Sequence, residues 1–231
     1  MKRLTALAVL LAAACSTAPA PDPAPTQPAA PVTQLAGTPC DPPLVIPASI
    51  VASVTAQFEE GRTTPAPPIS AEDRATYQAN EAKQRAADWG NLCRFRAANG
   101  QLMRGAAEPA RVVFMGDSIT QNWGLARPGF FNAVNVNRGI AGQTTPQMLL
   151  RFNADVIALK PAAVHIMAGV NDIAGNTGPT TLEDVENNTA AMVELAKAHG
   201  IKVILATPLP AATFSWAPAL QPKESVVQLV A

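Results

Sequence analysis

From Arg111 onward, short apolar runs alternate with amphipathic segments, and this rhythm most strongly constrains how the chain can fold. We expect strands at 111–117, 132–139, 162–169 and 201–208, and helices at 145–160 and 181–199. The third run, "AAVHIMAG", is almost continuously apolar, as in a parallel strand that is covered on both faces. Strands that alternate with helices predict an α/β fold in which a parallel sheet forms the middle layer of a three-layer sandwich.

Each expected strand is followed by a distinctive loop. The loops "GDSIT", "RGIAGQTT" and "AGVNDIAGN" follow the first three strands, and "TPLPAATF" follows the fourth. Because the carboxyl ends of parallel strands share one edge of the sheet, these loops should converge there. Open α/β sheets bind their ligands at that edge, so we expect the functional site to lie on it.

Ser118 is the candidate nucleophile, because it would stand at the end of the first strand and at the start of a helix. Gly142 can present its backbone N–H, and Asn171 its side-chain amide, to an oxyanion. In the simpler alternatives, Ser118 caps the helix, Gly142 supplies a left-handed backbone angle, and Asn171 stabilises an Asx turn. Asp117 and Asp172 are expected to order their loops rather than to act in catalysis.

The blocks "GDSIT", "NRGIAGQTT" and "AGVNDI", in this order, resemble those of the SGNH hydrolases, also called GDSL lipases and esterases. The resemblance covers about residues 111–210 and implies a flavodoxin-like α/β/α sandwich that hydrolyses carboxylic esters. It places Ser118 on the family's nucleophile, and it places Gly142 and Asn171 in the oxyanion hole. It implies an acyl-enzyme intermediate and no metal or organic cofactor.

The last block of that family, Asp-x-x-His, supplies the catalytic acid and base and does not occur in this sequence. We expect His165 inside the third strand and His199 at a helix end, so neither is assigned the role of base. We therefore expect the domain to be incomplete, without its last strand and helix. A serine without its base can lose about 10⁶ in rate, so we expect the chain to be nearly inactive. The alternative is a non-catalytic envelope lipoprotein that binds a ligand in the same pocket.

The first fifteen residues, "MKRLTALAVLLAAAC", have the pattern of an export signal. Two basic residues precede an apolar stretch that is too short to span a bilayer. Cys15 resembles the lipidated residue of a bacterial lipoprotein, and cleavage with release is the alternative. Residues 16–47 are rich in Pro and Ala and would form a tether. The sequence predicts an exported protein of the cell envelope, anchored to the membrane through lipid, or else secreted or periplasmic.

Residues 48–104 are expected to form a helical preface that packs on the hydrolase-type domain at 105–231. Ser70 suits a helix N-cap, with an acidic residue three positions later. Tyr77 and Trp89 are expected in the core of this preface rather than in contact with a ligand.

The charge balance and the cysteines limit the possible partners. Basic and acidic residues number 17 each, so nothing indicates nucleic acid, and a small ester of a lipid or an acylated glycan fits better. Cys40 and Cys93 can pair in an exported protein, and two isolated thiols are the alternative. The sequence suggests no metal site, because it lacks a Cys-x-x-Cys motif.

Overall fold

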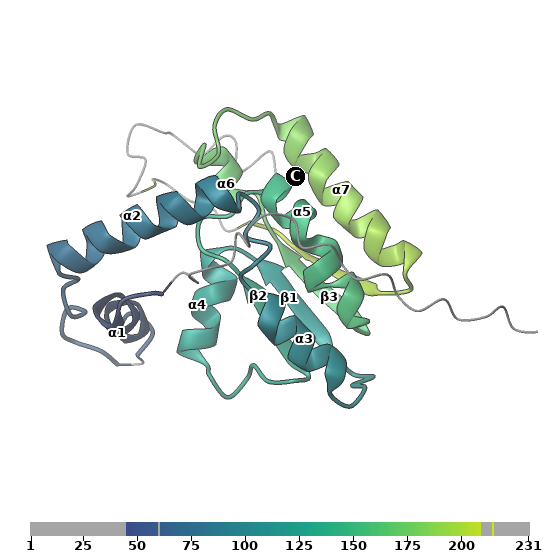
Figure 1. Cartoon of the computed structure of the whole chain (residues 1–231), viewed down its shortest axis with the longest axis horizontal. Helices are drawn as coiled ribbons and strands as arrows, with labels where there is room; N and C mark the ends of the chain where they lie inside the picture. Colours follow the sequence, from purple (N-terminus) through teal and green to yellow (C-terminus); the bar gives the residue numbers. More distant parts are fainter. Residues whose placement is uncertain (1–44, 60, 209–213, 215–231) are drawn as a thin grey trace, which may run out of the picture. The chain divides into compact units, whose positions relative to one another are not determined.

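The computed structural model describes residues 45–59, 61–208 and 214, and within them one parallel sheet is formed (Figure 1). Its strands are β1 (Val112–Gly116), β2 (Asn135–Gly139), β3 (Ala163–Met167) and β4 (Lys202–Ala206). Their spatial order is β2-β1-β3-β4, with every neighbouring pair parallel. β2 is added on one side of β1, and β3 and β4 are added on the other side, so the strand order reverses between β1 and β3. The crevice at such a switch point is where α/β sheets bind ligands. The predicted α/β fold is confirmed.

The two faces of the sheet are covered by different helices. Helices α5 (Thr145–Asp155) and α7 (Leu182–Ala198) lie side by side on one face (Figure 1). Because side chains alternate along a strand, Val113 and Met115 point into that layer, where they are fully buried. Phe114 points to the other face, where its ring packs edge-on against Trp123 of α4 (Ser118–Ala126). The sheet therefore has helices on both sides, as the sandwich requires.

The helices begin and end where the local sequence indicates. Pro146 lies in the first turn of α5, and Thr144 and Gln147 form a capping box there. Helix α7 has a capping box as well, from Thr181 and Asp184. Gly200 follows α7 with a φ of 70°, which a side chain would strain. A short 3₁₀ helix, η1 (Ile157–Leu159), connects α5 to β3.

The preface is helical, with α1 (Ala48–Ala56), α2 (Ala71–Ala87) and α3 (Arg96–Arg104). Ser70 caps α2 by accepting the N–H of Asp73, as predicted. The prediction that Tyr77 and Trp89 are core residues is wrong. Helix α2 has no buried residue, and the side chain of Trp89 is 43% exposed. Trp89 contacts the hydrolase-type domain through its backbone carbonyl, which accepts from Gln147 at 2.7 Å.

Several predictions concern residues outside the described part of the chain. They include the signal at 1–15 with Cys15, nearly all of the tether at 16–47, and the predictions for the carboxyl-terminal segment. Within residues 45–59 and 61–208, no helix is both long and apolar enough to cross a membrane. Cys93 is disulfide-bonded, and its predicted partner, Cys40, lies outside the described residues.

Candidate active site

The turn after β1 holds Ser118 at the start of α4. A Cβ atom at Gly116 would collide with the side chain of Thr120, so the close approach of β1 to α4 requires glycine. Asp117 is the N-cap, and its carboxylate accepts the N–H of Ile119 at 2.9 Å. The capping alternative for Ser118 is therefore wrong. Among the described residues, the half-buried Ser118 makes no side-chain hydrogen bond, so its hydroxyl is not used to hold the turn.

Gly142 lies in the loop that follows β2. The loop leaves the sheet beside the end of β1, because the N–H of Ile140 donates to the carbonyl of Gly116 at 3.0 Å. Gly142 has a φ of 76°, and an added Cβ would meet only the side chain of Asn176, at 3.6 Å. Glycine is therefore required there by the backbone angle, as the alternative reading held, and not by crowding. Asn176 also donates to the carbonyl of Gly142 at 3.0 Å, which fixes the loop from one side.

Asn171 joins the three loops. It lies in the short helix α6 (Val170–Ile173) and is 3% exposed. Its amide nitrogen donates to the carbonyl of Gln143 at 2.9 Å and lies 3.4 Å from the carboxylate of Asp117. Its amide oxygen accepts from Asn176 at 3.0 Å. The amide nitrogen contacts two other loops, and the amide oxygen accepts from the side chain of Asn176 and not from a nearby backbone N–H, so the Asx-turn alternative is wrong. The structure brings the loops of Ser118, Gly142 and Asn171 together.

The two acidic residues of these loops have structural partners, as expected. Asp172 accepts from both the backbone N–H and the hydroxyl of Thr145 and so anchors the start of α5. Burial raises the pKa of Asp117 to about 6, although its bond from Ile119 opposes the rise. Burial also raises the pKa of Asp172, against the effect of its bonds from Thr145. Both carboxylates order their loops.

A buried polar network lies behind the loops, and the sequence analysis missed it. Arg151 is fully buried and donates to Gln143 at 2.6 Å, to Asp155 at 2.8 Å and to the carbonyl of Arg138 at 2.7 Å. Asn99 of α3 donates to Asp155 at 2.6 Å and accepts two bonds from Arg138. The only signal in the sequence was the spacing of Arg151 and Asp155, which is equally typical of a surface pair.

This network carries charge in a dry environment. Burial lowers the pKa of Arg138 to about 10, and Asp155 opposes the fall. Burial likewise lowers the pKa of Arg151, again against the effect of Asp155. The guanidinium of Arg138 also lies over the ring of Phe95, 4.6 Å from its centroid. Arg151 is ion-paired with Asp155, and Arg138 is held by neutral oxygens of Asn99 and the Asn137 carbonyl, so both buried guanidinium groups have hydrogen-bond acceptors.

Neither histidine is brought to Ser118. His165 lies in β3 with its ring 5.4 Å from that of Phe114, and burial lowers its pKa. Its Nδ1 is buried and finds no hydrogen-bond partner in the described part of the structure. His199 is exposed at the end of α7, where its ring contacts the carbonyl of Leu195 at 2.8 Å. That position is just before β4, at the opposite edge of the sheet from the loops.

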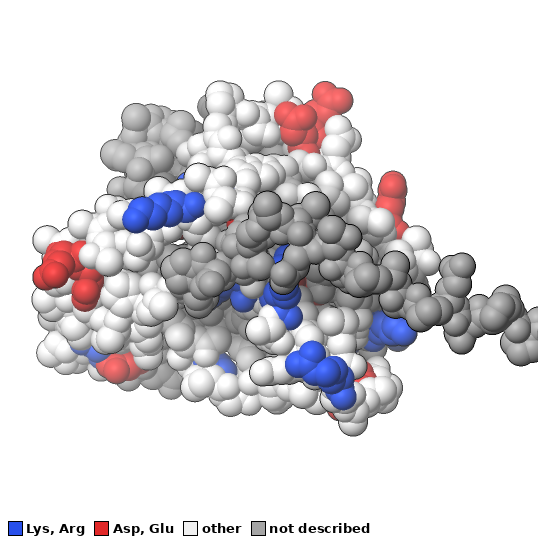
Figure 2. Space-filling model, viewed as in Figure 1, with Lys and Arg blue, Asp and Glu red and all other residues white. Residues whose placement is uncertain are grey.

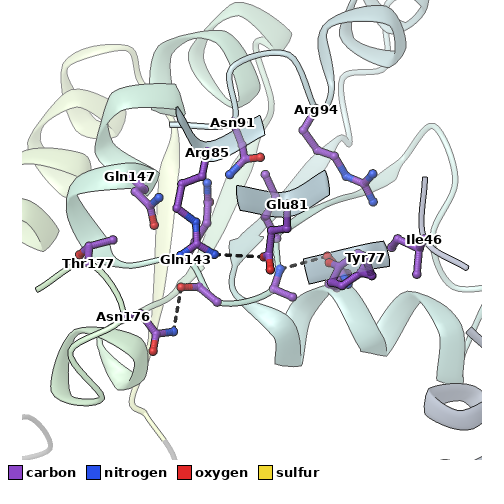
Figure 3. A pocket seen from close by; sticks show the side chains of 14 residues that line it. Ile46, Tyr77, Glu81, Arg85, Asn91, Arg94, Gln143, Gln147, Asn176 and Thr177 are labelled. Carbon is purple, nitrogen blue, oxygen red and sulfur yellow. Dashed lines mark hydrogen bonds and ion pairs between the residues drawn. The ribbon is translucent and has the colours of Figure 1, made fainter. Parts of the chain in front are cut away.

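A pocket lies beside Gly142, between the hydrolase-type domain and the preface (Figure 3). The loop after β2 and the residues Asn176 and Thr177 form one side of it. The other side comes from the preface, with Tyr77, Glu81, Arg85, Asn91 and Arg94. On the visible face of the described residues, basic and acidic side chains are dispersed and no continuous patch of one sign forms (Figure 2). Nor do the described residues hold any group of three metal-ligating side chains.

Comparison with known proteins relates this site to ester hydrolases. The chain is 40% identical over 78 residues to the uncharacterised lipoprotein YqeF of Bacillus subtilis, covering 32% of each chain. It is 36% identical over 88 residues to the acetylxylan esterase of Geobacillus stearothermophilus, covering 27% of this chain and 40% of that one. The chain thus spans well under half the length of these two curated relatives.

A solved structure extends the likeness to the fold. The GDSL-like lipase of Bacteroides thetaiotaomicron superposes with a TM-score of 0.59 at 44% identity, over 62% of this chain and 70% of that one. Residues 114–231 match the GDSL-like lipase/acylhydrolase family and include all three loops of the site. The resemblance to SGNH hydrolases is confirmed: the chain belongs to the GDSL-like lipase/acylhydrolase family, a family of carboxylic ester hydrolases.

Proposed function

We propose that Ser118 is the nucleophile of a serine esterase that acts on short acyl esters of carbohydrates. The observation that carries the proposal is the free hydroxyl of Ser118 at the switch point of the sheet. Because Asp117 caps α4, that hydroxyl is left for chemistry. Attack would form a bond from Oγ to the acyl carbon and release the alcohol, which takes up the serine proton. Water would then hydrolyse the acyl-enzyme and restore the hydroxyl.

Three donors are available for the oxyanion that develops during attack. Among the described residues, the backbone N–H groups of Ser118 and Gly142 donate to no other group. The amide nitrogen of Asn171 gives one hydrogen to Gln143, and its second contact, to Asp117, is long at 3.4 Å. A contact of that length is easily exchanged for an oxyanion. Removing one such donor typically costs about 3 kcal/mol of transition-state stabilisation.

The proposal assigns no residue as the base that accepts the proton of Ser118. The sequence has no Asp-x-x-His, and His165 and His199 lie away from Ser118 in the described structure. The proposal therefore rests on the nucleophile and the oxyanion donors. The non-catalytic alternative is not favoured, because the family and the esterase relative both indicate ester hydrolysis.

The substrate class follows from the relative and from the pocket. The Geobacillus relative is named for acetylxylan, an acetylated carbohydrate. The pocket beside Gly142 has a free volume of only about 30 Å³, too small for a long acyl chain, and most of the side chains that line it are polar. We also propose that the protein is exported and anchored at Cys15. The likeness to a lipoprotein and the signal-like first fifteen residues support that location.

The test is hydrolysis of p-nitrophenyl acetate and p-nitrophenyl butyrate by the full chain, beside the variants Ser118→Ala and Thr189→Val. Thr189→Val is the matched control, because it removes a hydroxyl from α7, away from the turn. We expect the wild type and the control to cleave acetate faster than butyrate. Ser118→Ala should fall to the rate of buffer. Equal rates for the wild type and Ser118→Ala, both well above the rate of buffer, would overturn the proposal.

A further inference from the structure

The pocket beside Gly142 is a composite of two segments. Gly142 and Asn176 come from the region that matches the family, residues 114–231. Tyr77, Arg85 and Arg94 come from the preface, which precedes that region. The preface therefore forms a wall next to the proposed oxyanion donors. A substrate bound at these donors could therefore also contact the preface, which lies outside the residues that match the family.

The wall is held rigidly. The carboxylate of Asp88 accepts the N–H groups of Leu92 and Cys93 at 2.9 and 2.8 Å, which closes a tight turn. The carbonyl of Gly90 in that turn accepts from Gln143, the neighbour of Gly142, at 3.1 Å. The pocket's preface side is thus tied directly to the loop after β2. A main chain that is fixed before binding lowers the entropic penalty of ordering the pocket.

The charges of the lining are unequal. Glu81 pairs with Arg85 at 3.2 Å and neutralises it. Arg94 is half-buried and, within the described residues, has no carboxylate partner. Its guanidinium lies 5.9 Å from the centroid of the Phe95 ring, and its charge acts against the burial that raises the pKa of Tyr77. The pocket therefore carries one unbalanced positive charge on a guanidinium, a group whose planar fork matches a carboxylate or a phosphate.

Neutral polar groups surround this guanidinium. Asn91 adopts a φ of 55°, an angle that asparagine tolerates better than most residues, and its side chain faces the pocket (Figure 3). Tyr77 and Arg94 lie on the same side of the pocket, across from Asn176 (Figure 3). An aromatic ring with amide side chains nearby offers a surface and hydrogen bonds for a hydroxylated ring.

We propose that the preface wall binds an acidic group on the alcohol portion of the ester, with Arg94 as its partner, and so selects acidic acylated sugars. The inference rests on the proposed esterase function, because it assigns the leaving alcohol to this pocket. Arg94 forms a bidentate contact with the acid, and Asn91 and Tyr77 bind the hydroxyl groups. Arg85, already paired with Glu81, adds only a secondary contribution.

The experiment measures binding by titration calorimetry of the full chain. Methyl glucuronoside is the acidic probe, methyl glucoside is its neutral counterpart, and glycerol phosphate tests whether a phosphate serves equally. We expect the glucuronoside to bind about tenfold more tightly than the glucoside, as a charge-assisted contact warrants. Arg94→Gln should abolish that preference. Arg94→Lys, which keeps the charge without the fork, should restore part of it. Tighter binding of glycerol phosphate than of the glucuronoside would assign the wall to phosphate instead of a sugar acid.

The matched control is Arg104→Gln, which removes an exposed guanidinium at the end of α3, outside the pocket. It should keep the preference of the wild type, and the unfolding midpoints of all variants establish that they are folded. Equal binding of both sugars by the wild type, or an unchanged preference in Arg94→Gln, overturns the inference. Because binding needs no turnover, this result is independent of the Ser118→Ala assay. Hydrolysis that does not depend on Ser118 would overturn the function and leave the binding result intact.

Discussion

The turn that carries Ser118 and the preface that carries Arg94 reach the same loop by different means. The turn is built from neighbours: Asp117 caps the helix that Ser118 begins, through a bond to Ile119. The preface is held by side chains that lie far away in the sequence. Gln143 and Gln147 donate to its backbone carbonyls across 53 and 58 positions. Local contacts fix Ser118, the proposed nucleophile, and contacts from residues far away in the sequence fix the wall of the pocket.

The largest expected effect comes from Arg151, because its partner Gln143 contacts both the preface and the loops of the site. Arg151→Met would leave Asp155 as a buried, uncompensated carboxylate and would remove the bond to Gln143. We expect a loss of about 3–5 kcal/mol in the free energy of unfolding, measured by chemical denaturation. Arg104→Met, an exposed arginine, should change that free energy by less than about 0.5 kcal/mol. A loss below about 1 kcal/mol in Arg151→Met would show that the two regions are not joined through this network.

An intermediate effect concerns the turn alone and depends on pH. Because burial raises the pKa of Asp117 to about 6, its protonated form favours the folded state. That contribution is complete below the ordinary carboxyl pKa and is lost as the pH rises through about 6. The loss amounts to about 1.4 kcal/mol for each unit of the shift.

Asp117→Asn tests this dependence, because asparagine keeps the helix cap and does not titrate. The difference in unfolding free energy between the variant and the wild type should grow in favour of the variant from about pH 4 to pH 6. The charge of Asp172 also helps to raise the pKa of Asp117, so the variant additionally loses the repulsion between the two carboxylates, which acts in the same direction. A difference that stays flat with pH would mean that Asp117 is not desolvated in the folded state.

The smallest effect is expected at the most conspicuous side chain of the preface. Trp89→Ala removes an exposed ring and keeps the carbonyl that accepts from Gln147, so stability should fall by less than about 1 kcal/mol. Phe95→Ala, in the same segment, removes the ring under Arg138 and should cost about 2 kcal/mol or more. The reverse order, measured by thermal unfolding, would mean that side-chain packing of Trp89, and not its main chain, docks the preface.

The difference between local and long-range contacts also explains which features the sequence could predict. The strands followed from apolar runs, and helix ends followed from local signals such as Ser70 and Gly200. The convergence of the loops followed from the parallel order of the strands. The docking of the preface did not. Two of its contacts end on the backbone carbonyls of Gly90 and Trp89, a group that every residue type carries, and others join Asn99 to Arg138 and Asp155, which lie far away in the sequence. The burial of Arg151 could not be predicted for a related reason. The sequence pattern of a basic residue four positions before an acidic one is the same for an exposed pair and for a buried pair.

Gln143 shows what such an arrangement demands of a single position. Its side chain accepts from Arg151 and donates to Gly90, while its main-chain carbonyl accepts from Asn171. Glutamate would lose the donor, leucine would lose both groups, and asparagine would be too short to keep both contacts. Laboratory evolution of this enzyme would therefore find freedom in the wall of the pocket and almost none at residue 143. Under the proposed function, new substrate preferences could be selected in the preface while the loop of Gly142 stays unchanged.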